Sequence, residues 1–223
     1  LFMLDILHRL GFNLVAGHLD HMLRSESSAE AGSVKAYIQA AGLPGVVEKA
    51  DVRAFARTNR LSIEAAARQL RYEFLFRQAN IFGAQAVAVA HSADDQVETF
   101  LLHLLRGAGL DGLTGMPYRS LPNAWSQSIP LVRPILSIWR SEILQYLSER
   151  NIEPHWDASN ADPAYLRNRV RHELIPTMEK YNPRIRQRLW QTSEILQQED
   201  HQIQVLVLQA WQDFLRQRGA GYL

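Results

Sequence analysis

The sequence predicts an α/β fold, in which a doubly wound, mostly parallel sheet is followed by a C-terminal helical extension. Short apolar runs alternate with longer segments of helical periodicity, as in chains built from strand–helix–strand units. Two of the apolar runs end in clusters of polar residues, HLDH and HSADD. Because ligands bind beyond the carboxyl ends of parallel strands, both clusters are expected to face one crevice.

The first elements establish this alternation. Residues 1–10 carry leucines at helical spacing and end before Gly11; residues 14–19 (LVAGHL) predict a buried strand, residues 25–41 a helix and residues 43–49 a second strand. A helix that feeds a parallel strand needs a strand before it for a right-handed crossover. We therefore expect the sheet to lack its first strand, together with the strand-to-helix turn that usually cradles phosphates.

The next segment carries clear boundary signals. Asp51 is expected to cap a short helix, and Ser62 to cap a longer one that ends at Gly83. Residues 85–90 (QAVAVA) form a continuous apolar run, which is typical of a buried parallel strand. A further helix is expected to follow this strand as far as Leu105.

The remaining chain is expected to become mainly helical. Its expected elements are a glycine-rich loop (RGAGLDGLTGMP), a strand at 129–133, a helix at 137–150, a loop (WDASNADP), a helix at 165–180 that Pro176 interrupts, and one or two long helices at 184–218. We place the boundary between the α/β domain, residues 1–175, and the helical extension, residues 176–223, at this change.

The amino-acid composition excludes several kinds of functional site. There is no cysteine, which excludes disulfides, thiolate zinc sites and cysteine nucleophiles and fits a reducing cytoplasm. No apolar run reaches about eighteen residues, so no transmembrane helix is expected. The net charge is +1, but nearly all basic residues are arginine, whose planar fork suits phosphate and base edges. A solvated, salt-bridged helix face would give the same composition.

The strongest candidate site is the stretch HSADDQVET, residues 91–99. A strand delivers His91 to the sheet edge, and Asp94, Asp95 and Glu98 lie at the start of the next helix. Acids at a helix start are partly explained by capping and the helix dipole. Paired acids at a sheet edge also suit an ammonium group or Mg²⁺, and the residues alone leave both interpretations open.

The stretch HLDHMLR ends the LVAGHL strand with His18, Asp20 and His21. The two histidines could bind a metal, but no third ligand follows locally. Hydrogen bonding to a nucleotide, or helix capping, is the interpretation that this spacing favours. We assign no metal-ligating residue.

Two arginine-bearing helices complete the candidates. Arg71 follows the sequence EAAARQL, and Arg167 and Arg171 are four residues apart, so that both can point at one phosphate. On spacing alone, each helix also fits an exposed face with ordinary ion pairs.

Taken together, these stretches resemble the tRNA(Ile)-lysidine synthases, members of the PP-loop, or N-type, ATP pyrophosphatases. The resemblance rests on HLDHMLR, EAAARQLRYEFL, AHSADDQVETFLLHLLRGAGLDGLTGM, LVRPIL and DASNADPAYLRNRVRHELIP, which occur in the family's order and spacing. It covers residues 1–190 or so and implies an adenine nucleotide alpha hydrolase-like fold with residues 1–175 as its PP-loop ATPase-like catalytic domain.

The resemblance also implies a reaction. ATP adenylates O2 of the wobble cytidine in a tRNA(Ile) with the anticodon CAU, and pyrophosphate leaves. The ε-amine of free lysine then attacks C2 and displaces AMP. ATP is a substrate, Mg²⁺ accompanies it, and the expected location is the cytoplasm. A homodimer is a further possibility.

Roles follow from the resemblance residue by residue. Asp95 and Glu98 match the lysine-recognising pair, with Asp94 beside them, and Arg71 and Arg167 match arginines implicated in catalysis. The expected ATP-binding residues are His18, Asp20, His91, Gly107 and Gly109, and the expected tRNA-binding residues are Arg169 and Arg171.

The sequence departs from the family in one respect. The SGGxDS phosphate loop, expected directly before Leu1, is not in the sequence, so we expect an N-terminally truncated chain with poor ATP turnover. Two alternatives remain: another PP-loop enzyme, either a thiolase-type tRNA modifier or an amide-forming synthetase, or a non-catalytic tRNA-binding remnant. Thiolases commonly use cysteine, and this sequence has none.

Overall fold

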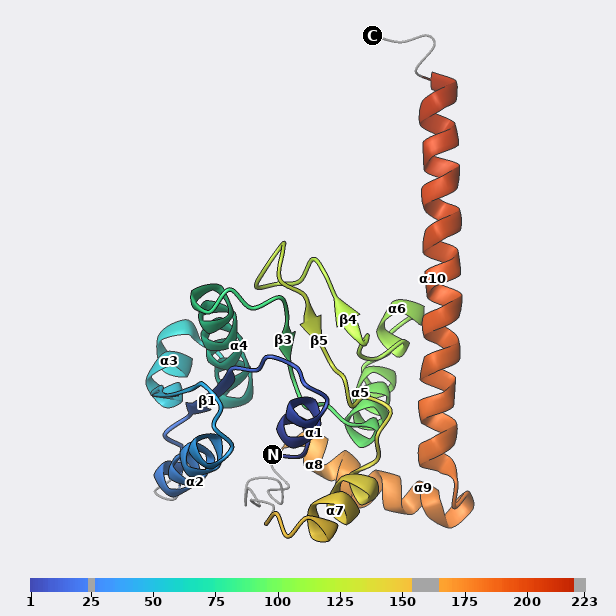
Figure 1. The fold of residues 1–223 in the computed structure, drawn as a ribbon. Coiled ribbons are helices and arrows are strands. Elements are labelled where there is room, and N and C mark those ends of the chain that lie inside the picture. The colour runs from blue at the N-terminus through green and yellow to red at the C-terminus, as the bar shows by residue number, and fades with distance from the viewer. Residues whose placement is uncertain (24–26, 154–164, 219–223) are drawn as a thin grey trace. The chain divides into compact units, whose positions relative to one another are not determined.

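The computed structural model describes residues 1–23, 27–153 and 165–218 (Figure 1). The chain forms two compact units. The first comprises residues 1–90, 118–134 and 143–155, and the second comprises residues 91–117, 135–142 and 156–223. The domain boundary expected after residue 175 stays a prediction.

The first unit contains all the described strands. Strand β1 (Ala16–Asp20) pairs in parallel with β2 (Gly45–Lys49), and β3 (Val87–Ala88) pairs in parallel with β5 (Leu131–Val132). Strand β4 (Arg119–Ser120) adds an antiparallel edge to β5, which the sequence did not reveal. The mostly parallel α/β class is confirmed, although β3 and β5 are shorter than the apolar runs that contain them.

Four helices of the first unit follow the predicted order. They are α1 (Phe2–Arg9), α2 (Ser27–Ala40), α3 (Val52–Asn59) and α4 (Ile63–Ile81). Both predicted caps are confirmed: the Asp51 carboxylate accepts a hydrogen bond from the Ala54 amide at 2.8 Å, and the Ser62 hydroxyl accepts one from the Ala65 amide at 3.2 Å. Each satisfies one of the otherwise unpaired amides of a first helical turn.

An aromatic core joins α4 to the three-stranded sheet. Tyr72 and Phe76 of α4 are buried together with Val87 and Leu131 of the sheet. The Trp125 ring stacks on the Tyr72 ring with 4.1 Å between centroids. Large apolar groups on one helix face therefore fix α4 against β3 and β5.

The second unit is helical. Its elements are α5 (Ala93–Leu105), α6 (Leu110–Leu113), α8 (Leu166–Arg169), η2 (Val170–Leu174), α9 (Ile175–Tyr181) and α10 (Ile185–Arg218), and helix α7 (Arg140–Glu149) begins in it and continues into the first unit. Its core contains Val97, Phe100 and Leu101 of α5 with Val170 and Ile175.

The glycine-rich segment corrects the expectation of a simple loop. It contains the one-turn helix α6, whose N-cap is Gly109 with an ordinary φ of −75°. Gly107 and Gly115 do have positive φ angles, 75° and 71°. At Gly115 an added Cβ would also lie 2.7 Å from the Gln96 side chain, so only glycine fits there without a shift.

The helix expected at residues 165–180 is interrupted before Pro176 and not at it. A five-residue π-turn, η2, separates α8 from α9, and Pro176 lies in the first turn of α9. Proline has no amide hydrogen to donate to the preceding turn, and a wider turn accommodates that loss.

Residues 184–218 form one helix and not two. In Figure 1, α10 is a single long helix that runs beside α5 and α6. Beyond Ile203 most of its large apolar side chains are exposed, among them Leu206, Trp211 and Phe214. None of the described helices is both long and apolar enough to span a membrane.

Candidate functional site

The N-terminus of α5 is organised by a capping box. The Asp95 carboxylate oxygen Oδ2 accepts hydrogen bonds from the Ser92 amide and the Ser92 hydroxyl, each at 2.9 Å, and the Ser92 hydroxyl accepts one from the Asp95 amide at 3.4 Å. This arrangement satisfies two unpaired amides at once. Capping, one of the two interpretations of these acids, is therefore confirmed for Asp95.

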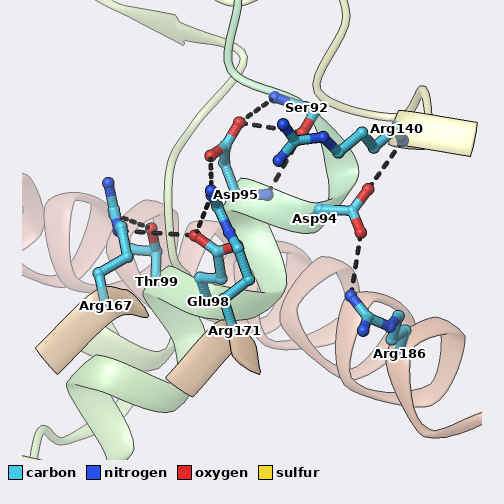
Figure 2. A network of polar contacts seen from close by, with 9 residues as sticks. All are labelled: Ser92, Asp94, Asp95, Glu98, Thr99, Arg140, Arg167, Arg171 and Arg186. Carbon is cyan, nitrogen blue, oxygen red and sulfur yellow. Dashed lines mark hydrogen bonds and ion pairs between the residues drawn. The ribbon is translucent and has the colours of Figure 1, made fainter. Parts of the chain in front are cut away.

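Glu98 is buried beside two arginines (Figure 2). Arg171 donates from Nε to Oε1 at 2.6 Å and from Nη2 to Oε2 at 3.0 Å, which is a bidentate pair. Arg167 lies 3.7 Å from Oε2 through Nε and donates from Nη2 to the Thr99 hydroxyl at 3.0 Å. Burial raises the pKa of Glu98 above its ordinary value, although Arg171 acts to lower it.

Asp94 is held on the other side of the same helix turn. Its Oδ2 accepts the Arg140 amide at 2.8 Å, at the start of α7, and its Oδ1 accepts Nη1 of Arg186 at 3.1 Å. Arg186 also donates to Glu179 at 2.7 Å. Asp94 therefore joins α5 to α7 and α10 and has a structural function in addition to any role in binding.

Each acid at the start of α5 is paired with an arginine. Three carboxylates, of Asp94, Asp95 and Glu98, face three guanidinium groups, of Arg167, Arg171 and Arg186. Within the described ranges, no three His, Asp or Glu side chains gather as a metal site would require. The donor set therefore does not fit a resident Mg²⁺ ion, because divalent ions need carboxylate oxygens that are not already paired with arginine.

Gln96 is a functional candidate that the sequence reasoning missed. Its fully buried amide donates to the carbonyls of Thr114 and Met116 at 3.2 and 3.3 Å, and its Oε1 accepts the Met116 amide at 2.8 Å. Gln96 therefore fixes the end of the glycine-rich segment to α5. A polar residue between two acids in the sequence gave no local signal of this contact.

The candidates of the β1 end lie in the first unit. Asp20 is buried, and its carboxylate accepts the Met22 amide at 2.9 Å. Burial lowers the pKa of His21 below its ordinary value, and the positive charges of Arg71 and His18 add to that effect. His18, His21 and Arg71 therefore share one electrostatic environment, which agrees with the expected polar end of the strand.

The structure thus brings the expected residues together in two groups. His18, Asp20 and Arg71 belong to the first unit, whereas His91, the three acids and the arginines of α8 and η2 belong to the second. Gly107, Gly109 and Arg169 are exposed. That both groups border one crevice stays a prediction, as do the roles of the individual residues.

Three comparisons bear on this arrangement. A family model described as a PP-loop domain matches residues 1–178. The tRNA(Ile)-lysidine synthase of Dehalococcoides mccartyi is 39% identical over 203 residues, which cover 88% of this chain and 43% of that protein. The tRNA(Ile)-lysidine synthase of Geobacter sulfurreducens is 41% identical over 205 residues, which cover 92% and 42%. The chain thus spans about two fifths of the length of these relatives.

Among solved structures, the chain is similar to the U34-tRNA thiolase NcsA of Methanococcus maripaludis with its [4Fe-4S] cluster. The TM-score is 0.68 at 14% identity, and the match covers 88% of this chain and 67% of the thiolase. At that identity the similarity supports the fold and says nothing of the reaction.

Proposed function

Since the chain belongs to the family of PP-loop domains, we propose that it is the catalytic part of an enzyme that joins lysine to the wobble cytidine of a tRNA(Ile) with the anticodon CAU. The observation that carries this proposal is the cluster of acids at the start of α5, held by arginines from α8, η2 and α10. It combines groups that can recognise an amine with groups that can recognise phosphate.

The proposed reaction has two steps. O2 of the cytidine attacks the α-phosphate of ATP, and pyrophosphate leaves with the β- and γ-phosphates. The neutral ε-amine of lysine then attacks C2, the C2–O2 bond breaks, and AMP leaves with O2. The amine loses its second proton to solvent or to a base, and the product is lysidine.

Asp95 is proposed to receive the lysine side chain, with Glu98 and Asp94 as supporting acids. Asp95 is 23% exposed, and its Oδ1 accepts no hydrogen bond from any described residue. An ammonium group can therefore approach this oxygen before it loses a proton for the attack. Glu98 and Asp94 are both hydrogen-bonded to arginines, so their contribution is to shape the site.

Arg71 and Arg167 are proposed as catalytic residues. The Arg167 side chain is 32% exposed, so part of its guanidinium can reach a substrate oxygen, while Nε lies 3.7 Å from Oε2 of Glu98. Donors that are fixed before the reaction stabilise charge that develops on phosphate. Arg169, which is exposed, is proposed to contact the tRNA backbone. Arg171, expected in the same role, is instead hydrogen-bonded to Glu98.

ATP is proposed to lie against His18, Asp20, His91, Gly107 and Gly109. The Asp20 carboxylate is fixed by the Met22 amide, which favours a hydrogen-bonding role at the end of β1. Mg²⁺ is proposed to arrive with ATP, as part of the substrate, because the described residues offer it no site of their own. Cytoplasmic location is proposed because tRNA and ATP are both there.

The experiment supplies the chain with an SGGxDS segment upstream of Leu1. With ATP, lysine and a CAU-bearing tRNA(Ile) transcript, we expect AMP release that requires both lysine and the tRNA, and lysidine in nuclease digests by mass spectrometry. Asp95→Asn should raise KM for lysine far more than KM for ATP. Folded protein that releases no AMP, or an equal rise in both constants, would contradict the proposal.

A homodimer is proposed through α10. Ile203, Val207, Ala210 and Phe214 follow the alternating three- and four-residue spacing of a coiled-coil seam, and all four are exposed. A second copy of the same helix provides a complementary seam. Val207→Glu should give monomers in sedimentation velocity, and the matched off-seam change Gln209→Glu should not. Monomers in the unchanged protein at all concentrations would refute the dimer.

A further inference from the structure

The two acids proposed to recognise lysine differ in how open they are. The Glu98 side chain is 1% exposed and the Asp95 side chain is 23% exposed. Both Glu98 oxygens accept hydrogen bonds from Arg171, at 2.6 and 3.0 Å, whereas Oδ1 of Asp95 has only an ion pair with Arg171 at 3.6 Å. The Asp95 carboxylate is therefore more accessible to a substrate ammonium group than the Glu98 carboxylate is (Figure 2).

From this asymmetry, and resting on the proposed function, we propose that Arg171 is a positioning residue of the lysine site, which occupies Glu98 and leaves Asp95 as the carboxylate that meets the substrate ammonium. Glu98 then acts through Arg171 and does not touch lysine. Arg171, which the family resemblance assigned to tRNA contact, has its function inside the site.

The free-energy cost of separating Arg171 from Glu98 favours an ion pair that stays intact when lysine binds. A buried carboxylate that loses its guanidinium partner keeps the desolvation cost without compensation. Burial is also the main cause that raises the pKa of Glu98, so the ionised form depends on Arg171. An incoming ammonium makes one point contact with a carboxylate, whereas the guanidinium spans both oxygens, so the exchange loses a hydrogen bond.

The backbone also favours a fixed Arg171. The residue lies in the π-turn η2, between Val170 and Ile175, which are both buried in the core of the second unit. Its side chain is 16% exposed and reaches α5 across 73 residues of sequence. A π-turn is a common way to direct side chains at functional sites. Here Arg167, in α8, and Arg171, in η2, both reach Glu98.

The first arm of the test needs no substrate. Carboxyl ¹³C signals of Glu98 are titrated by NMR in the unchanged chain, in Arg171→Gln and in the control Arg188→Gln, whose arginine donates a hydrogen bond to Gln191 on α10. We expect the pKa of Glu98 to rise by about one to three pH units in Arg171→Gln alone. If that variant does not fold, Arg171→Lys, which cannot span both oxygens, should give a smaller rise. An unchanged pKa would overturn the proposal.

The second arm adds L-lysine. The side-chain Nε–H signal of Arg171, assigned from its loss in Arg171→Lys, should stay in place while the backbone amides of residues 92–95 shift. Loss or large movement of the Nε–H signal at saturating lysine would show that ammonium displaces the guanidinium and would overturn the proposal. If neither signal responds to lysine, the lysine site of the proposed function fails, while the first arm still judges the pairing of Arg171 with Glu98.

Discussion

Arg186 and Asp94 form an ion pair at 3.1 Å although 92 residues separate them in the sequence. The pair fixes the first turns of α10 to the N-terminus of α5, directly beside the proposed lysine site. Because Asp94 also accepts the Arg140 amide, its carboxylate connects three helices. The position of the acids of α5 thus depends on α10, a helix that comes much later in the sequence.

Asp94→Ala should therefore destabilise the second unit. The change leaves the Arg186 guanidinium and the Arg140 amide without this acceptor, and the expected loss is about 1–3 kcal/mol of unfolding free energy, since one of the two hydrogen bonds involves two charges. Urea unfolding followed by circular dichroism measures it. Glu199→Ala, which removes an exposed acid of α10, is the matched control and should change stability little. Equal stability of both variants would show that the pair contributes nothing.

Gly115→Ala should destabilise the protein more than Gly109→Ala does. At Gly115 the φ angle is 71° and a Cβ would lie 2.7 Å from Gln96, whereas nothing lies within 4 Å of a Cβ at Gly109. A left-handed position costs alanine about 1 kcal/mol or more, and displacement of Gln96 adds the loss of its buried hydrogen bonds. Thermal melting of the two variants provides the comparison. Identical melting temperatures would contradict the described loop geometry.

Tyr146→Phe should shift acid unfolding to higher pH. Burial acts to raise the pKa of Asp5, but hydrogen bonds from Tyr146, at 2.6 Å, and from Arg9 outweigh it and hold the pKa below its ordinary value. The stability that Asp5 contributes is thus complete above the pKa of the unfolded chain and is lost as the pH falls through the folded one. Without the Tyr146 hydroxyl the folded pKa rises, so the loss begins at higher pH.

The shift is measured by following the folded fraction as the pH is lowered from neutral to about 2. Tyr181→Phe is the control, because Tyr181 is 88% exposed and its hydroxyl makes no hydrogen bond within the described residues. A Tyr146→Phe protein that unfolds at the same pH as the control would rule out the contribution of Asp5.

Arg167→Ala should lower kcat for tRNA-dependent AMP release about 100-fold, the usual order for loss of one fixed donor to developing charge. Its Nη2 bond to Thr99 at 3.0 Å sets the side-chain direction, so Thr99→Val should give a smaller loss. The assay is the one described for the proposed function, with Arg188→Ala as control. An unchanged kcat would show that Arg167 has no catalytic role and only forms ordinary ion pairs.

Local signals made much of the fold predictable. Asp51 and Ser62 act within three residues of their own positions, so the sequence shows both caps directly. Helix α6 was missed because its four residues lie among glycines that favour a loop. Strand β4 was missed because a two-residue edge has no apolar periodicity of its own.

The candidate site was predictable in its residues and not in its pairing. The acids of α5 were identified from their spacing after a strand, and Arg167 and Arg171 from their four-residue spacing on one helix. The pairing of Glu98 with Arg171 and of Asp94 with Arg186 depends on how helices that are far apart in the sequence pack together. Side-chain spacing shows which residues share a face of one helix, but it contains no information on which helix lies opposite.

Helix α10 rises about 1.5 Å per residue, so its 34 residues extend over about 51 Å without a break. Its first turns are anchored at Asp94, and its last described turns carry exposed apolar side chains. Because α10 also packs against α5 and α6, a partner that bound its exposed end would act on the same helix that holds the acids of α5 in place.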